Sequence, residues 1–260
     1  MDFEKTVTLA VPALFVVLVA MERWRPARPL PRVPGWRWKG VAFFLVAGAV
    51  SALVPALCGA LLRPRLLHLE DAGVVPTTIV GFVAVELFLY AWHRLRHATF
   101  LWRVHQLHHS AERVDMFGAT FSHPLDLAST NLVIAAVATV VLGLGSTAAA
   151  LVGFLVTACA FFQHANVRTP VWLGYLVQRP EAHSVHHARG IHAGNYCDLP
   201  LWDLVFGTFK NPARFEAEAG FHDGASRELC ALLIGRDVAG GQPHVEDRPN
   251  RPVGDGLIRR

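Results

Sequence analysis

The feature that most constrains this chain is a stretch from Leu127 to Gln163 without a single charged residue. At about 1.5 Å per residue, one helix of this length would measure about 55 Å, whereas the hydrocarbon core of a bilayer is about 30 Å thick. Gly143 and Gly145 lie near its middle. We therefore predict a helical hairpin that turns at this glycine pair and crosses a membrane fully or partly.

Three other apolar stretches of membrane length precede the hairpin, at about residues 7–21, 41–62 and 74–92. Hydrophobic residues make up 53% of the 260 residues and charged residues only 17%. That balance is rare in a soluble domain of this size. The sequence therefore predicts an all-α, integral membrane bundle of four to five spans.

Basic residues concentrate in the loop between the first two stretches, which holds a single acid, Glu22. They are Arg23, Arg25, Arg28, Arg32, Arg37 and Lys39. By the positive-inside rule this loop is cytoplasmic, and contact with anionic lipid explains the net charge of +4 without a nucleic-acid partner. Counting spans from this loop places residues 93–126 and 164–260 together on the cytoplasmic side. The abundant Ala, Arg and Val suggest a GC-rich bacterial source, and hence an inner membrane.

The two segments on this side hold every histidine except His68, and several of them form motifs. One motif is H-x-x-x-H at 93–97, and two are H-x-x-H-H, at 105–109 and 183–187. On a helix, residues four apart lie on one face, so the first motif can hold one ion. In H-x-x-H-H, the first two histidines share a face by their spacing of three, and the last is rotated. Each such motif is therefore expected to supply two ligands to one ion and one to its neighbour.

The number of histidines indicates more than one metal ion. Imidazole binds iron, zinc, copper and nickel, so the ligand type alone does not select the metal. A structural zinc ion needs four protein ligands and a catalytic one needs three. The motif histidines exceed that number, which favours a binuclear site in a histidine-rich helical cap. A thiolate site is not predicted, because the chain has no C-x-x-C pair among Cys58, Cys159, Cys197 and Cys230.

The order of these motifs resembles the fatty acid hydroxylase superfamily, which includes sterol desaturases, C4-methylsterol oxidases and alkylglycerol monooxygenase. The resemblance extends over roughly Leu87 to Asn211 and includes the H-P-x-D element at 123–126, the Asn195-Tyr196 pair and the segment 202–208. It implies a di-iron, O2-dependent enzyme that hydroxylates or desaturates a lipid C–H bond. The lipid could be a sterol, fatty acyl, carotenoid or ether lipid.

The resemblance also implies the site residues and the partners. By motif position, the metal ligands would be His93, His97, His105, His108, His109, His164, His183, His186 and His187, with His123 as a tenth candidate. Asn195, Tyr196, Asp203 and His192 are candidates for hydrogen bonds that orient the ligands; turn formation and packing are the alternative for the first three. Electrons would come from a separate ferredoxin- or cytochrome-type protein, and no bound haem or flavin is expected.

The chain then divides into three regions. Residues 1–73 would form N-terminal spans and the basic loop, 74–211 the catalytic domain, and 212–260 a polar tail that is mobile from about Gly235. The spans contain one acid in their apolar part, Glu86. We expect it to pair with a histidine or arginine, or to line a substrate cavity.

Two other functions fit the residues. A membrane metal transporter or metal-binding protein would hold histidines, but transporters usually place ionisable ligands at mid-membrane, whereas these lie at span ends. A zinc-dependent lipid hydrolase would need a carboxylate base near the ion. Glu112 and Glu181 flank the two H-x-x-H-H motifs and could supply it.

Overall fold

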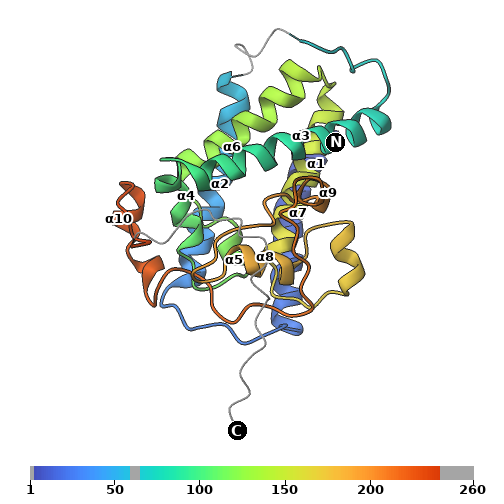
Figure 1. Ribbon diagram of the computed structural model, residues 1–260. Coiled ribbons are helices and arrows are strands. Elements are labelled where there is room, and N and C mark those ends of the chain that lie inside the picture. The colour runs from blue at the N-terminus through green and yellow to red at the C-terminus, as the bar shows by residue number, and fades with distance from the viewer. Residues whose placement is uncertain (1–2, 59–64, 241–260) are drawn as a thin grey trace.

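The computed structural model describes residues 3–58 and 65–240, and their regular structure is helical apart from one bridge between Ala188 and Ala219 (Figure 1). Five helices are long and apolar enough to cross a membrane. They are α1 (Phe3–Trp24), α2 (Trp36–Cys58), α3 (Val74–Ala98), α6 (Pro124–Ala136) with its continuation η1 (Val137–Val141), and α7 (Ser146–His164). The predicted all-α membrane bundle is confirmed, with five candidate spans.

The predicted hairpin is present, and a short π-helix precedes its tip. The π-helical η1 leads into a reversal before α7, where Gly143 adopts φ 60°, a conformation that favours glycine. The carbonyls of Val140 and Val141 accept hydrogen bonds from the N–H groups of Leu66 and Leu67. The loop that contains His68 therefore lies at the tip of the hairpin.

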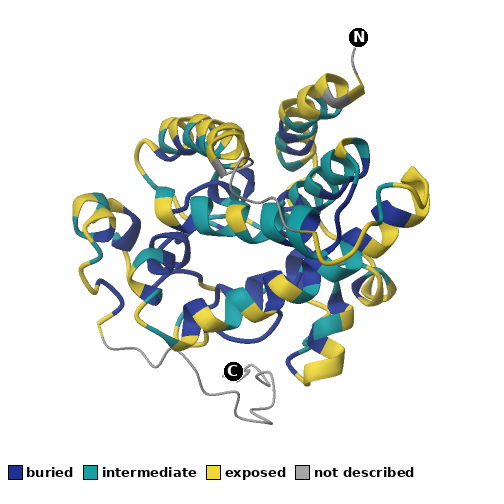
Figure 2. Ribbon diagram, turned by 90° about the horizontal axis from the view of Figure 1, so that it is seen from above, coloured by how far each residue is buried: buried dark blue, intermediate teal, exposed yellow. Residues whose placement is uncertain are grey.

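The long helices pack through small and β-branched residues. Val85 of α3 and Val152 and Val156 of α7 belong to one buried apolar cluster. In α1, Phe15 makes an edge contact with Phe161 of α7, with ring centroids 5.7 Å apart. The outward faces remain uncovered (Figure 2), and only 11% of the apolar window of α1 is buried. Such uncovered apolar faces are expected where lipid is the neighbour.

The basic loop lies beside the histidine-bearing end of α7. Ala27 N–H donates to Asn166 O at 2.9 Å, and the Asn166 side chain donates to Arg28 O at 2.8 Å. Arg113, which follows the first H-x-x-H-H motif, donates to Pro31 O. The basic loop and the histidine motifs thus share one side of the bundle, as the span count predicts.

Short helices gather around the ends of α3 and α7 that carry histidines (Figure 1). They are α4 (Trp102–His109), α5 (Met116–Ala119), η2 (Val171–Tyr175), α8 (Pro180–His186), α9 (Pro200–Phe206), η3 (Ala225–Arg227) and α10 (Leu229–Leu233). Proline at the first turn begins both α8 and α9, where its missing N–H costs no helical hydrogen bond. These elements form the cap.

The segment after residue 211 differs from the predicted polar tail. Phe221, Leu232 and Val238 are buried in one cluster with Leu107 of α4. The Gln106 side chain accepts from Val238 N–H and donates to a nearby backbone carbonyl. Apolar residues that are widely spaced in this segment thus cover α4. Because they follow no helical or strand periodicity, the sequence did not predict this packing. Residues 241–260 of the predicted tail lie outside the described residues.

Candidate metal centre

Histidines of the cap and the span ends converge into two groups. Within each group, one ring nitrogen from every member lies within 4.8 Å of those of the others. The first group consists of His93, His97, His105, His109 and His186. The second consists of His108, His164, His183 and His187. Nearly all of these side chains are buried, and together they are the nine motif ligands predicted from the sequence.

Each H-x-x-H-H motif divides its histidines between the two groups. In α4, His105 and His109 join the first group, whereas His108 joins the second. The motif of α8 does the reverse, since its central His186 joins the first group and the outer two join the second. The predicted two-to-one division is present, but the two histidines of a motif that join the same group are four residues apart and not three. Around the axis of an α-helix, side chains four residues apart differ in direction by only about 40°, whereas those three residues apart differ by about 60°.

The Nε2 atoms lie at the spacing of ligands on one ion. In the first group, His105 Nε2 is 3.1 Å from both His93 Nε2 and His109 Nε2. In the second, His183 Nε2 is 3.1 Å from His164 Nε2 and 3.0 Å from His187 Nε2. Two nitrogens that each lie about 2.0–2.1 Å from a metal, at about 90–110°, are separated by about 2.8–3.4 Å.

Hydrogen bonding between the rings cannot satisfy this arrangement. A neutral imidazole carries one proton and one lone pair, and each nitrogen has only one of them. His105 Nδ1 faces the carboxylate of Asp126 at 2.9 Å, so its proton is placed there. Its Nε2 then holds a lone pair that faces two other nitrogens. A cation between the three nitrogens would satisfy all of them.

Unsatisfied nitrogens support the same conclusion. Both ring nitrogens of His97 and Nε2 of His186 are buried without a hydrogen-bond partner among the described residues. Buried polar atoms rarely stay unsatisfied, because the lost hydration is not replaced. The residues present therefore fit metal ions, which His186 Nε2 and one ring nitrogen of His97 would coordinate.

Backbone carbonyl oxygens contact the Nδ1 atoms of several grouped histidines. His93 Nδ1 lies 2.8 Å from Tyr196 O, His186 Nδ1 lies 2.8 Å from Gly194 O, and His164 Nδ1 lies 2.7 Å from Ala160 O. Each carbonyl accepts the Nδ1 proton, which leaves the lone pair on Nε2. Such contacts fix both the tautomer and the direction of a metal ligand.

Burial keeps the cap histidines in the form that binds metal. It is the main reason why the pKa values of His108, His109, His183 and His187 lie well below the usual range, and neighbouring histidines lower them further. Metal ligands must be neutral imidazoles. These four side chains therefore present lone pairs at neutral pH.

The family profile of the fatty acid hydroxylases matches residues 78–208, which span half of the chain and all nine grouped histidines. The chain belongs to the fatty acid hydroxylase family. The resemblance seen in the motifs is confirmed.

This fatty acid hydroxylase family member is similar to two kinds of curated protein, whose names state different reactions. The chain is 27% identical to the ornithine lipid hydroxylase OlsE of Rhizobium tropici, over 80% of this chain and 66% of the relative. It is 31% identical to the very-long-chain aldehyde decarbonylase GL1-1 of Oryza sativa subsp. indica, over 66% of this chain and 29% of the relative. The chain thus spans less than two thirds of either relative. No solved structure matches it.

One supporting residue of this family member was missing from the predicted site. Asp126 accepts from His105 Nδ1 at 2.9 Å and from Arg96 at 2.7 Å, with its two different oxygens. The signal was present in the H-P-x-D element at 123–126. The histidine of that element was the predicted ligand, whereas its aspartate is the residue that contacts the first histidine group.

His123 itself lies outside both groups. As the residue before α6, it accepts Leu125 N–H on Nδ1 at 3.1 Å, and its Nε2 lies 3.0 Å from Leu233 O. Both ring nitrogens are therefore used by the protein. The geometry describes a helix cap whose ring also contacts α10.

The residues predicted to orient the ligands lie in the loop between α8 and α9 or contact it. Asp203 accepts from Tyr196 N–H at 2.8 Å and from Cys197 N–H at 3.0 Å. Asn195 donates to Ala182 O while in the left-handed region, with φ 52°. Of these residues, Tyr196 contacts His93 through its carbonyl, and Asn195 and Asp203 hold the loop that carries Tyr196.

His192, the fourth of these candidates, lies beside the first group. Its Nδ1 is 3.2 Å from His109 Nδ1, on the side of the His109 ring that faces away from the group's other nitrogens. It also adopts φ 43°, an uncommon conformation for a residue with a side chain. His192 therefore contacts a grouped histidine directly but does not belong to either group.

Glu86 has a different partner from the one expected. Its Oε2 accepts from Asp198 N–H at 3.0 Å and Leu199 N–H at 3.2 Å, and Cys197 Sγ lies 3.0 Å away. The predicted pairing with histidine or arginine is not made among the described residues. The carboxylate instead ties the middle of α3 to the loop that orients His93.

The two carboxylates considered as hydrolytic bases have structural partners. Glu181 accepts from both the N–H and the hydroxyl of Thr169 and pairs with Arg179. Glu112 accepts from Gly224 N–H at 2.8 Å. Neither belongs to a histidine group of the described residues.

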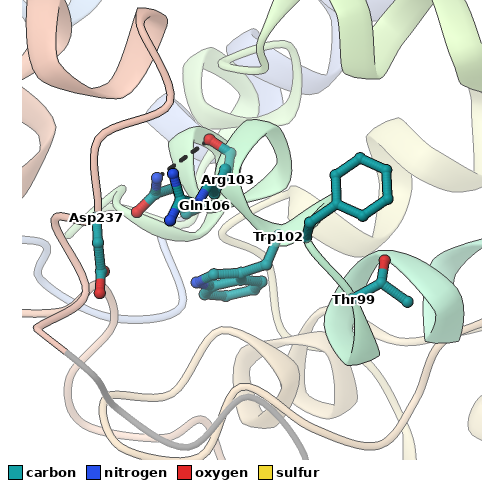
Figure 3. A pocket seen from close by; sticks show the side chains of 6 residues that line it. Thr99, Trp102, Arg103, Gln106 and Asp237 are labelled. Atoms are coloured by element: carbon teal, nitrogen blue, oxygen red, sulfur yellow. Dashed lines mark hydrogen bonds between the residues drawn. The ribbon is translucent and has the colours of Figure 1, made fainter.

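A hollow of about 200 Å³ lies where the chain passes from α3 into α4 (Figure 3). Its lining comprises Thr99, Phe100, Trp102, Arg103, Gln106 and Asp237. The Trp102 indole packs against His97 and His109, with ring centroids 5.1 and 5.3 Å apart. One aromatic ring therefore separates the hollow from the histidines.

Proposed function

We propose that this chain is a membrane-bound, O2-dependent di-iron enzyme that hydroxylates a lipid. The observation that carries the proposal is the pair of histidine groups whose Nε2 atoms have the spacing of metal ligands, in a member of the fatty acid hydroxylase family. Residues 74–211 would be the catalytic domain. Iron is preferred over zinc because zinc has no redox chemistry with which to activate O2.

The reaction needs electrons from outside. Insertion of one oxygen atom of O2 into a C–H bond gives an alcohol, and the other atom leaves as water after taking up two electrons and two protons. The bound ions would supply the activation of O2. The chain would hold the imidazoles neutral and directed, and its burial of the groups would exclude bulk water. We propose a separate one-electron carrier protein as the donor.

The substrate is proposed to be a membrane lipid with a long acyl chain. Both histidine groups include residues at the end of a candidate span, α3 for the first group and α7 for the second, where a carbon of such a chain can lie. Hydroxylation is preferred over other outcomes because the relative named as an ornithine lipid hydroxylase matches 80% of this chain. The basic loop beside the groups supports a cytoplasmic site, which we place at a bacterial inner membrane.

Metal analysis combined with O2 uptake tests the proposal. The purified chain, supplied with a reductant and a lipid extract, should contain about two irons and consume O2 in proportion to hydroxylated lipid. His186→Ala should abolish uptake, whereas His222→Ala, a matched change of a partly exposed histidine, should not. Zinc with O2-independent lipid hydrolysis would favour the hydrolase. Metal uptake into vesicles without oxidation would favour the transporter.

A further inference from the structure

The cap carries an apolar surface that no described residue covers. We name it the α9–η2 surface, and its members are between 44% and 63% exposed: Trp172, Tyr175, Leu176, Leu201, Leu204, Val205 and Phe206. The two elements contact each other, and Tyr175 also packs against Phe209 with ring centroids 5.6 Å apart. Contiguous exposure of so many large apolar side chains marks a contact with a partner or a membrane.

The orientation of α9 is the reverse of that of a helix on a water-soluble protein. Pro200 and Asp203 are buried, whereas Leu204, Val205 and Phe206 face outward. In water an amphipathic helix buries its apolar face and exposes its charges. In α9, Asp203 is buried instead, because its carboxylate accepts backbone N–H groups of the loop at 196–197. The outward face therefore requires an apolar neighbour.

This surface continues the outer surface of a candidate span. Trp202 Nε1 donates to Val83 O of α3 at 3.0 Å, and the Phe206 ring stacks on Tyr90 with centroids 4.9 Å apart. One turn before Val83, Ile79 and Val80 are 60% and 50% exposed. α9 is thus attached along the span itself, where lipid already covers the neighbouring side chains if α3 crosses the membrane.

We propose that the α9–η2 surface is immersed in the bilayer, so that the cap contacts lipid in addition to the five long helices. Tryptophan and tyrosine are enriched where a protein meets the membrane interface, and this surface contains both. Because the inner face of α9 holds Tyr196, whose carbonyl orients His93, lipid borders the first histidine group across a single helix. This last step rests on the proposed function, whereas the lipid contact does not.

Spin labels on the full chain in phosphatidylcholine–phosphatidylglycerol vesicles test the contact. A label at Val205→Cys is compared with one at Asp223→Cys, whose side chain is 96% exposed on the cap, and the signal of the labelled parent chain is subtracted. Oxygen concentrates in lipid, while a water-soluble nickel chelate is excluded from it. We expect the ratio of oxygen to nickel collisions to be several-fold higher at Val205→Cys.

The other outcomes overturn the proposal. A nickel collision rate at Val205→Cys equal to that at Asp223→Cys would mean that water covers the surface. Low rates for both reagents would mean that a second copy or another protein covers it. Leu204→Cys repeats the measurement should the first variant fold poorly. The readout does not require metal or turnover, so its failure is distinguishable from failure of the proposed function.

Discussion

Asp126 of α6 accepts the Nδ1 proton of His105 in α4 at 2.9 Å, while Arg96 of α3 holds its other oxygen at 2.7 Å. Three helices therefore meet at one carboxylate directly behind a candidate ligand. Asp126→Asn should weaken metal binding, because the amide can present an N–H to His105 and favour the wrong tautomer. Loss of such a support typically costs about 10–100-fold in metal affinity or activity.

Iron per chain and O2 uptake measure this effect. Asp115→Asn is the matched control, since Asp115 is also buried, caps α5 and belongs to neither histidine group. The control should lose some stability yet keep its iron. Equal iron content in Asp126→Asn and the parent chain would refute the supporting role.

His97 and His123 should behave oppositely, although both are buried histidines of the predicted site. His97 has two nitrogens without hydrogen-bond partners in the described structure and belongs to the first group. His97→Ala should therefore reduce bound metal and abolish turnover. His123→Ala should keep the metal and lose about 0.5–2 kcal/mol of unfolding free energy, the usual cost of a lost helix cap.

Metal analysis and thermal unfolding of both variants separate the two roles. Loss of iron from His123→Ala, with His97→Ala still loaded, would reverse the assignment.

Adjacent histidines in α4 should affect different ions. His108 belongs to the second group and His109 to the first. Each alanine variant should therefore lower the iron content by about one ion per chain, and the remaining ion should differ between them. Mössbauer spectra of the two iron-57 variants test this directly. Identical residual spectra would show that the groups do not act as separate sites.

Local spacing predicted the long helices and the eight grouped histidines of the three motifs, whereas the ninth, His164, was predicted from the resemblance to fatty acid hydroxylases. Apolar length reveals a span, and a hairpin follows from a stretch too long for one crossing. The H-x-x-H-H spacing likewise indicates a division between two ions. Whether His105 pairs with His108 or with His109 depends on where the opposing α8 lies, and that is set by tertiary packing.

Residues that act through long-range contacts were harder to predict. Glu86 reaches a loop more than a hundred positions away, so no local pattern names its partners. Phe221 and Val238 read as isolated apolar residues in a polar region, but they cover α4. His123 and Asp126 lie in one short motif, and spacing alone could not tell which one contacts the histidine groups.

Glu86 should act as a positioning residue for the loop at 197–199. Its Oε2 accepts two backbone N–H groups and faces the Cys197 thiol, and the loop begins beside Tyr196 O, which orients His93. Glu86→Ala would leave two buried N–H groups without acceptors, at about 1–3 kcal/mol for each unsatisfied group. Glu86→Gln keeps an oxygen acceptor and should retain part of that stability.

Thermal unfolding and iron spectroscopy distinguish a positioning role from a merely structural one. Glu112→Gln is the control, because Glu112 is a buried acid that also accepts backbone N–H groups, in the segment at 224–226. All three variants should unfold at lower temperature, but only the two Glu86 variants should alter the spectrum of the iron in the first group. An unchanged spectrum in Glu86→Ala would mean that the loop keeps Tyr196 in place without this carboxylate.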